Sequence, residues 1–121
     1  MVKMVKAQIE DAKMLLQIQK EAFIKYAKKY GDFESNPYHM DLHRMEFNIK
    51  YRYGQYYKIL DEKSLEIVGG IFCFELDEKP IMKIAQFYFK NGYQHLGYGT
   101  YVLNELFKLN KNVKTWYVDT I

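Results

Sequence analysis

The sequence of 121 residues contains a single cysteine, so no disulfide can form within the chain. This thiol, Cys73, lies inside the apolar run of residues 67–74. A free cysteine in an apolar surrounding usually packs as a small hydrophobe. We therefore interpret Cys73 as a buried core residue rather than as a catalytic nucleophile.

The sequence also lacks a long apolar run and a dense cluster of lysine and arginine. No stretch approaches the roughly 20 apolar residues that a helix needs to cross a bilayer. Charges interrupt every apolar run of the N-terminal segment MVKMVKAQIEDAK, which is unlike a signal peptide. These absences predict a cytoplasmic protein with no membrane partner and no nucleic-acid partner. The net charge of +3 is mildly basic and suits an anionic ligand.

The composition and the hydrophobic periodicity predict one compact domain over residues 1–121. Hydrophobic residues make up 49% of the chain and aromatic residues 17%, enough for a core and an aromatic-lined pocket. The periodicity predicts a mixed α/β (α+β) fold with elements in the order β-α-α-β-β-β-α-β. The predicted strands are residues 4–8, 56–60, 66–76, 81–89 and 114–119, and the predicted helices are residues 10–30, 41–52 and 99–109.

Two pairs of glycines interrupt this pattern. Gly69 and Gly70, inside a predicted strand, indicate a β-bulge or a close approach to the backbone. Gly97 and Gly99 lie at the strand-to-helix corner YQHLGYGT. The N-terminus of a helix leaves its first N–H groups unpaired and attracts phosphate, and glycine lets the backbone approach such an anion. The two glycines alone fit a phosphate loop and an ordinary left-handed turn equally well.

Comparison with known phosphate loops narrows this choice. The Walker pattern GxxxxGK[ST] is absent, and a dinucleotide pattern GxGxxG would place its third glycine at Val102. The segment Gln94–Gly99 matches Q/R-x-x-G-x-G/A instead, and it resembles the acyl-CoA loop of the GNAT N-acetyltransferase superfamily. The segments IAQFYF, TYVLNELF, EIVGGI and VKAQIEDAKMLLQIQKEAF fit the family pattern too, and DFESNPY resembles a loop of some bacterial members.

The resemblance implies a GNAT-like fold with a mostly antiparallel central sheet. It also implies transfer of an acetyl group from acetyl-CoA to a primary amine of an acceptor by direct attack. In this family the loop N–H groups hold the CoA pyrophosphate, and the preceding strand pairs with the pantetheine arm. The CoA-binding residues that the resemblance implies are Phe87, Tyr88, Phe89, Gln94, His95, Leu96, Gly97, Tyr98, Gly99 and Thr100.

The catalytic groups follow less directly from the resemblance. Many family members carry a glutamate base early in the strand before the loop, where this chain has Lys83. Glu75 on the neighbouring predicted strand is our candidate general base, acting through water, although a surface carboxylate with a cross-strand partner is an alternative interpretation. A non-catalytic CoA-binding or regulatory module, or a protein-interaction domain on the same fold, is the alternative to an enzyme.

The C-terminal end also departs from the family pattern. Family members usually continue through a further helix and two strands, so we expect a domain that is truncated at its C-terminus. The strand at residues 114–119 would then have an open edge that could form a homodimer.

Aromatic residues between the first two predicted helices are candidates for the acceptor site. The tentative substrate-binding residues are Tyr30, Phe33 and Tyr38. His39 and His43 are four residues apart and could share one helix face, but no third metal ligand is evident. We therefore expect no metal site.

Overall fold

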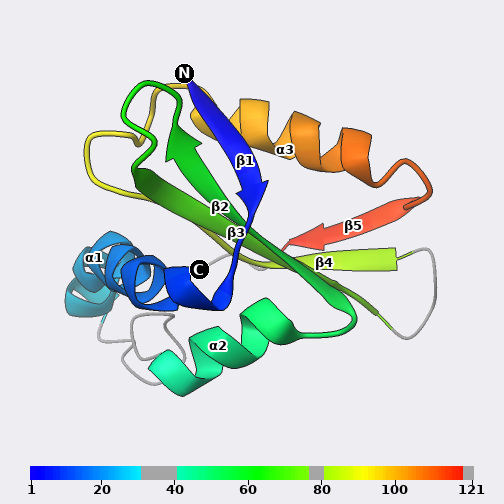
Figure 1. Ribbon diagram of the computed structural model, residues 1–121, viewed down its shortest axis with the longest axis horizontal. Coiled ribbons are helices and arrows are strands. Elements are labelled where there is room, and N and C mark those ends of the chain that lie inside the picture. Colours follow the sequence, from blue (N-terminus) through cyan, green and yellow to red (C-terminus); the bar gives the residue numbers. More distant parts are fainter. Residues whose placement is uncertain (31–40, 77–80, 119–121) are drawn as a thin grey trace.

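The computed structural model describes residues 1–30, 41–76 and 81–118, which form a central sheet with helices on both faces (Figure 1). The predicted order of elements is confirmed, with one short 3₁₀ helix (η1) added after the first strand. In chain order the elements are β1 (Val2–Lys6), η1 (Ile9–Asp11), α1 (Ala12–Tyr30), α2 (Leu42–Lys50), β2 (Gly54–Asp61), β3 (Ile67–Glu75), β4 (Ile81–Phe89), α3 (Tyr98–Leu109) and β5 (Thr115–Val118).

The five strands form one sheet in the order β1-β2-β3-β4-β5. The first four strands pair antiparallel, while β5 runs parallel to β4. The predicted mixed fold with a mostly antiparallel sheet is confirmed. Within the described residues β5 has no strand on its outer edge, and a homodimer through this edge stays a prediction.

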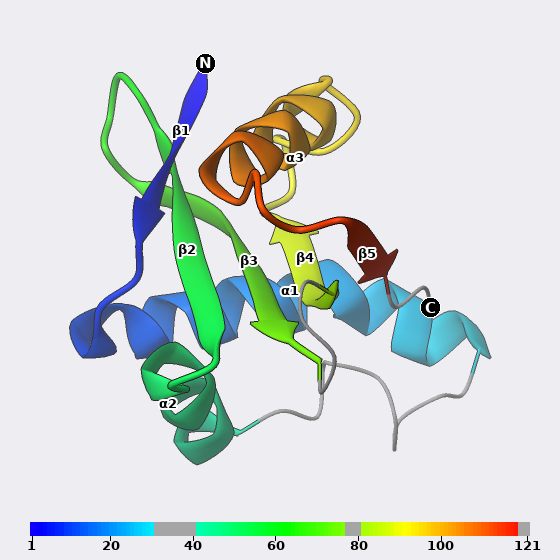
Figure 2. The same cartoon turned by 90° about the vertical axis from the view of Figure 1, so that its right-hand side faces the viewer.

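The helices divide the core into two layers. Figure 2 shows α3 on one side of the sheet and α1 with α2 on the other. Val102 and Leu106 of α3 belong to one buried cluster, whereas Leu15 of α1 and Met45 of α2 belong to the other. Because side chains alternate along a strand, the three central strands β2, β3 and β4 contribute to both clusters.

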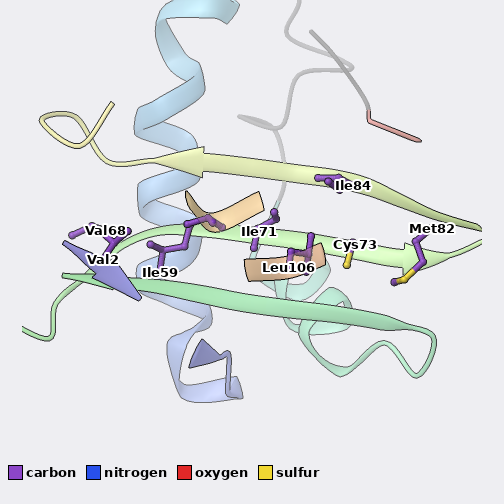
Figure 3. Close-up of a cluster of buried hydrophobic side chains, with 9 residues drawn as sticks. Val2, Ile59, Val68, Ile71, Cys73, Met82, Ile84 and Leu106 are labelled. Carbon is purple, nitrogen blue, oxygen red and sulfur yellow. The ribbon is translucent and has the colours of Figure 1, made fainter. Parts of the chain in front are cut away.

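Cys73 belongs to the buried cluster between α3 and the sheet. Its members are Val2, Ile59, Val68, Ile71, Cys73, Met82, Ile84, Val102 and Leu106 (Figure 3). Cys73 has no exposed surface, and burial raises the pKa of its thiol to about 12. A thiol that stays protonated inside the core is a poor nucleophile. The interpretation of Cys73 as a buried core residue is confirmed.

The first strand begins and ends two residues before the predicted range of 4–8. Its antiparallel pairing with β2 sets these limits. The chain then turns into η1, where the N–H of Gln8 donates to Oδ2 of Asp11 over 2.8 Å. The same carboxylate accepts from Nζ of Lys58 at 2.9 Å, which anchors the start of α1 to β2. The pairing of β1 with β2 and the Lys58–Asp11 ion pair join segments that are distant in the sequence, which explains the shift from the sequence-based range.

The glycine pair in β3 lies both at a β-bulge and at a close approach of another strand, the two roles that the sequence indicated. The register between β2 and β3 shifts beside Gly69, between Ile59 and Leu60, which marks a β-bulge. On the other edge β4 approaches closely. A Cβ on Gly69 would lie 2.5 Å from the backbone oxygen of Tyr88, and a Cβ on Gly70 would overlap the Tyr88 hydroxyl.

Candidate functional site

Strand β4 has a paired half and an open half. Residues Ile81 to Ile84 pair with Thr115 to Val118 of β5, and the described residues contain no further pair between the two strands. The residues from Ala85 to Phe89 therefore have β3 on one edge and, within the described chain, no strand on the other. A β-bulge marks the boundary, because Cys73 lies opposite Ile84 while Phe72 lies opposite Gln86. The open half offers unpaired backbone groups to a ligand.

A cavity of about 430 Å³ lies against this open half. Its volume is in the range of small-molecule sites. The lining residues are Ala22, Phe23, Phe87, Tyr88, Phe89, Tyr93, Gln94, His95, Gly97, Gly99 and Thr100. The structure thus brings together every predicted CoA-binding residue except Leu96 and Tyr98. Leu96 is 57% exposed, and Tyr98 lies beside the cavity with its ring centroid 6.3 Å from that of Tyr93.

The two glycines of the corner have different tasks. Gly97 is the N-cap of α3 and has a left-handed backbone, with φ 81° and ψ 0°. A Cβ on Gly97 would meet nothing within 4 Å, so its requirement is conformational. Gly99 does not have a positive φ, and a Cβ there would lie 3.8 Å from the ring of Phe87. Gly99 therefore keeps the space between α3 and the open half of β4 clear.

The backbone of the corner is rich in unpaired donors. Among the described residues, no N–H group from Gln94 to Thr100 makes a backbone hydrogen bond of standard geometry. These groups include the first N–H groups of α3, where the helix dipole places a partial positive charge. Unpaired amides at the end of a helix are the donor set that a pyrophosphate satisfies. The residues present therefore fit a CoA pyrophosphate.

Several contacts hold the corner in this conformation. The side chain of Gln94 donates from Nε2 to the backbone oxygen of Phe89 over 3.0 Å. The N–H of Lys90 donates to the backbone oxygen of Val68 over 2.7 Å, which ties the end of β4 to β3. The hydroxyl of Tyr93 donates to Oδ2 of Asp61 over 2.7 Å. Gln94 thus stabilises the corner through its side chain, in addition to the backbone role that the motif predicts.

Sequence reasoning missed three residues of the cavity wall. Ala22 and Phe23 belong to the apolar stripe of α1, and such a stripe indicates only that the residues face the core. Tyr93 precedes the motif, and its place in the wall depends on the turn between β4 and α3. No sequence signal separates these side chains from ordinary core residues.

Two buried tyrosines, one in β2 and one in the open half of β4, contact each other. The hydroxyls of Tyr56 and Tyr88 form a hydrogen bond, and the ring of Tyr56 stacks on that of Phe72 at 5.3 Å. Phe23 packs its ring edge against Tyr88 at 6.4 Å between centroids. Burial raises the pKa of both hydroxyls above the ordinary value. The pair stays neutral at physiological pH and has a structural role.

Glu75 lies away from the corner. It lines a second cavity, of about 390 Å³, together with Met82 and residues of the α3–β5 connection. Lys83 lies opposite Phe74 on β3 and Tyr117 on β5. The structure thus does not bring Glu75 together with the CoA-binding residues, and its role as a base stays a prediction.

The predicted acceptor residues cannot be placed. Phe33 and Tyr38 lie outside the described residues, as does the side chain of Tyr30. His39, one of the two histidines weighed as a metal pair, also lies outside them. In the ranges that are described, no group of three or more His, Cys, Asp or Glu side chains could hold a metal ion.

Comparison with known proteins identifies the family. The model of the acetyltransferase (GNAT) family matches residues 13–120. The chain belongs to the acetyltransferase (GNAT) family. This membership confirms the resemblance to the GNAT superfamily and makes the chain a GNAT-type N-acetyltransferase. No curated protein matches the sequence.

Solved structures agree with the fold of this GNAT protein. A tetramutant of the BH1408 protein from Bacillus halodurans has a TM-score of 0.82 at 14% identity, covering 98% of this chain and 83% of its own. The ribosomal-protein-alanine N-acetyltransferase from Brucella melitensis has a TM-score of 0.70 at 12% identity, covering 100% and 81%. The PaiA N-acetyltransferase from Thermoplasma acidophilum, solved with coenzyme A, has a TM-score of 0.70 at 16% identity, covering 92% and 72%. At such identities the likeness shows the fold alone.

None of the helices within residues 1–30, 41–76 and 81–118 is both long and apolar enough to cross a bilayer.

Proposed function

We propose that this GNAT protein transfers an acetyl group from acetyl-CoA to a primary amine of an acceptor by direct attack. The observation that carries the proposal is the run of unpaired N–H groups from Gln94 to Thr100 beside the open half of β4. The structurally similar PaiA N-acetyltransferase, solved with coenzyme A, supports the choice of CoA as the donor.

The corner and the open half of β4 would share the binding of acetyl-CoA. The unpaired amides would hold the pyrophosphate, with the partial positive charge of the α3 N-terminus behind them. The amides of the pantetheine arm would pair with the free backbone edge of residues 87–89, as an added strand pairs with a sheet edge. The aromatic rings of Phe87 and Phe89 would cover the apolar parts of the arm.

The transfer reaction depends more on how the amine and the thioester are positioned than on reactive side chains. The neutral amine nitrogen attacks the carbonyl carbon of the thioester, a C–N bond forms, and the C–S bond breaks. The amine loses one proton, and the thiolate of CoA leaves and takes up a proton. A free backbone N–H of β4 would polarise the carbonyl oxygen and stabilise its developing charge. Holding both substrates together supplies a further large part of the rate.

Glu75 is the proposed base, and it would act through water. It lies opposite Met82, three residues before Ala85, where β4 opens. With a rise of about 3.3 Å per residue, the separation along the strand is about 10 Å, so the proton would have to pass along a chain of waters. Glu75→Gln should lower kcat and remove a limb of its pH profile without changing the affinity for CoA. An unchanged pH profile would exclude Glu75 as the base.

The acceptor would bind aromatic residues at the end of α1 and in the sequence that follows it. We propose Tyr30, Phe33 and Tyr38 as its contacts. Alanine substitutions there should raise KM for the amine and leave KM for acetyl-CoA unchanged. Equal changes in both constants would contradict this assignment.

A non-catalytic CoA-binding module is the second candidate, and Lys83 favours it. In many family members the matching position carries a glutamate base, whereas this chain has a lysine there in place of a carboxylate. A protein-interaction domain on the same fold is the third candidate. The three candidates differ in two measurable properties, which are binding of CoA and release of CoA.

Calorimetry with acetyl-CoA provides the first test. A ligand that binds the folded state raises the melting temperature, with a stabilisation of about 2.7 kcal/mol at a concentration of 100 times Kd. We expect such a shift at millimolar acetyl-CoA, and its absence would leave only the interaction domain. A thiol assay for CoA release, with a panel of primary amines, then separates the enzyme from the non-catalytic module.

A further inference from the structure

One hydrogen bond joins the turn between β2 and β3 to the segment that leads into the corner. The hydroxyl of Tyr93 donates to Oδ2 of Asp61 over 2.7 Å, between residues 32 positions apart in the chain. Tyr93 lines the cavity, whereas Asp61 is the last residue of β2 and does not line it. Asp61 therefore makes no direct contact with a ligand in the cavity, and its hydrogen bond to Tyr93 links it to the cavity wall.

The carboxylate of Asp61 is itself fixed. Its Oδ1 accepts from the N–H of Lys63 at 2.8 Å and from the N–H of Ser64 at 3.2 Å. The backbone of Asp61 also bonds to that of Glu66 at 3.0 Å and of Leu65 at 2.8 Å. The hydroxyl of Tyr93 and the two amides lower the pKa of the carboxyl below its ordinary value. Asp61 is thus a charged acceptor held by its own turn.

Tyr93 stands directly before the run of unpaired amides. Its N–H donates to the backbone oxygen of Lys90 at 3.0 Å, and its ring lies against that of Tyr98 at the start of α3. The next residues include two positive φ angles, 61° at His95 and 81° at Gly97. A loop with such a backbone loses fewer conformations on binding a ligand when its entry point is already fixed.

We propose that Asp61 is a positioning residue for the CoA pyrophosphate, acting through the hydroxyl of Tyr93. The bond holds the first turn of the corner in the conformation that presents the amides of residues 94–100 together. This inference rests on the proposed function, because it names how the same site is kept ready for its ligand. It assigns Asp61 no contact with the ligand.

The test is a double-mutant cycle on CoA binding, measured by isothermal titration calorimetry. Tyr93→Phe removes a single oxygen atom and keeps the ring in the wall. Both Tyr93→Phe and Asp61→Ala should weaken CoA binding by about tenfold, and the double variant should be no weaker than either one. Asp61→Asn, which keeps an acceptor oxygen, should retain most of the affinity. A loss below twofold in Tyr93→Phe, or additive losses in the double variant, would overturn the proposal.

A control variant and a shortened ligand separate positioning from a general loss of structure. Tyr57→Phe removes a hydroxyl that donates to Gln55 at 3.0 Å, away from the cavity, and should leave CoA binding unchanged. S-acetylpantetheine has the arm of acetyl-CoA without the pyrophosphate, and ligand-detected NMR follows its binding. Its affinity should not differ between the wild type and Tyr93→Phe, and an equal loss for both ligands would contradict the role of Asp61. If the wild type itself fails to bind CoA, the proposed function fails first.

Discussion

The two ends of β4 each carry a cavity of similar volume, but the polar groups in the two walls differ. The cavity of about 390 Å³ at the paired end contains Gln55 and Asn110. Nε2 of Gln55 donates to Oδ1 of Asn110 at 2.7 Å, and Nδ2 of Asn110 donates back to Oε1 of Gln55 at 3.2 Å. At the open end, the amides of the corner make no backbone hydrogen bond of standard geometry among the described residues.

This difference shows that volume alone does not identify a binding site. A buried or crowded polar group without a partner is costly, so proteins usually satisfy such groups internally. The side-chain amides of Gln55 and Asn110 at the paired end form hydrogen bonds with each other. The backbone N–H groups of the corner at the open end remain available to a ligand. The contrast predicts that substitutions at the paired end change stability, whereas substitutions at the open end also change ligand binding.

The largest expected effect is a loss of stability from truncation at the paired half. Ile84 is 2% exposed and packs beneath α3 (Figure 3). Ile84→Ala leaves a cavity, so the free energy of unfolding should fall by about 2–5 kcal/mol. Urea denaturation followed by circular dichroism measures this loss. Because Ile84 does not line the open-end cavity, Kd for CoA should stay within about twofold on the folded protein. A large change in Kd would show that the two halves are coupled.

The second effect concerns the tyrosine pair beneath the open half. Tyr88→Phe leaves the hydroxyl of Tyr56 buried without its partner, which should lower the free energy of unfolding by about 1–3 kcal/mol. The double variant Tyr56→Phe with Tyr88→Phe removes both hydroxyls and should be more stable than either single variant. Urea denaturation of the three variants gives the comparison. Additive losses would contradict the assignment of the two hydroxyls to one shared bond.

A pH series tests the same pair independently. Burial raises the pKa of Tyr56 and Tyr88 above the value of 10.0 that applies in the unfolded chain. The folded protein therefore keeps protons that the unfolded chain releases, and stability should fall as pH rises above 10. Cys73 contributes with the same sign from pH 9 upward, since its pKa of about 12 also exceeds its ordinary value of 9.0. The double phenylalanine variant should show a shallower fall.

The third effect separates the two glycines of the corner. Gly97→Ala places a side chain on a left-handed backbone, which should destabilise the fold by about 1–2 kcal/mol and weaken CoA binding as the loop relaxes. Gly99→Ala meets the ring of Phe87 at an ordinary contact distance and should change stability by less than about 1 kcal/mol. Gly99→Val should fill the space beside the ring and abolish the acetyl-CoA melting shift. A full shift in Gly99→Val would place the ligand elsewhere.

The parts of this fold that the sequence predicts are those with a local signal. The change from a period of two to a period near 3.6 locates each strand and helix to within two residues at either end. The corner was predictable because two glycines before a helix indicate both a tight turn and unpaired N–H groups that can bind an anion. Gly97 and Gly99 lie where the motif requires them, at the N-terminus of α3.

The parts that the sequence does not predict depend on pairing between distant segments. The bulge at Ala85 follows from the register of β4 on β3, which no short stretch determines. The bond between Asp61 and Tyr93 joins two turns that meet only in the folded chain. Phe23 lines the cavity because α1 lies across the open half, although its spacing on the helix is that of a core residue.

The smallest expected effect lies at the boundary between the two halves. Gln86 follows the bulge, and its Oε1 is buried with no hydrogen-bond partner in the described chain. An unsatisfied buried acceptor destabilises a fold by about 1–3 kcal/mol, and methionine has a similar shape. Gln86→Met should therefore raise the free energy of unfolding, by up to about 1 kcal/mol, in urea denaturation.

The matched control for this change lies in the paired-end cavity. Gln55→Met removes an amide that exchanges two hydrogen bonds with Asn110, and the same substitution should lower stability there by about 1–3 kcal/mol. Opposite signs at the two positions would show that the polar groups of the paired end are satisfied, while those at the boundary are not. A loss of stability in Gln86→Met would mean that a water molecule already donates a hydrogen bond to Oε1 of Gln86. The contrast between the two ends would then depend on the unpaired donors of the corner and not on Gln86.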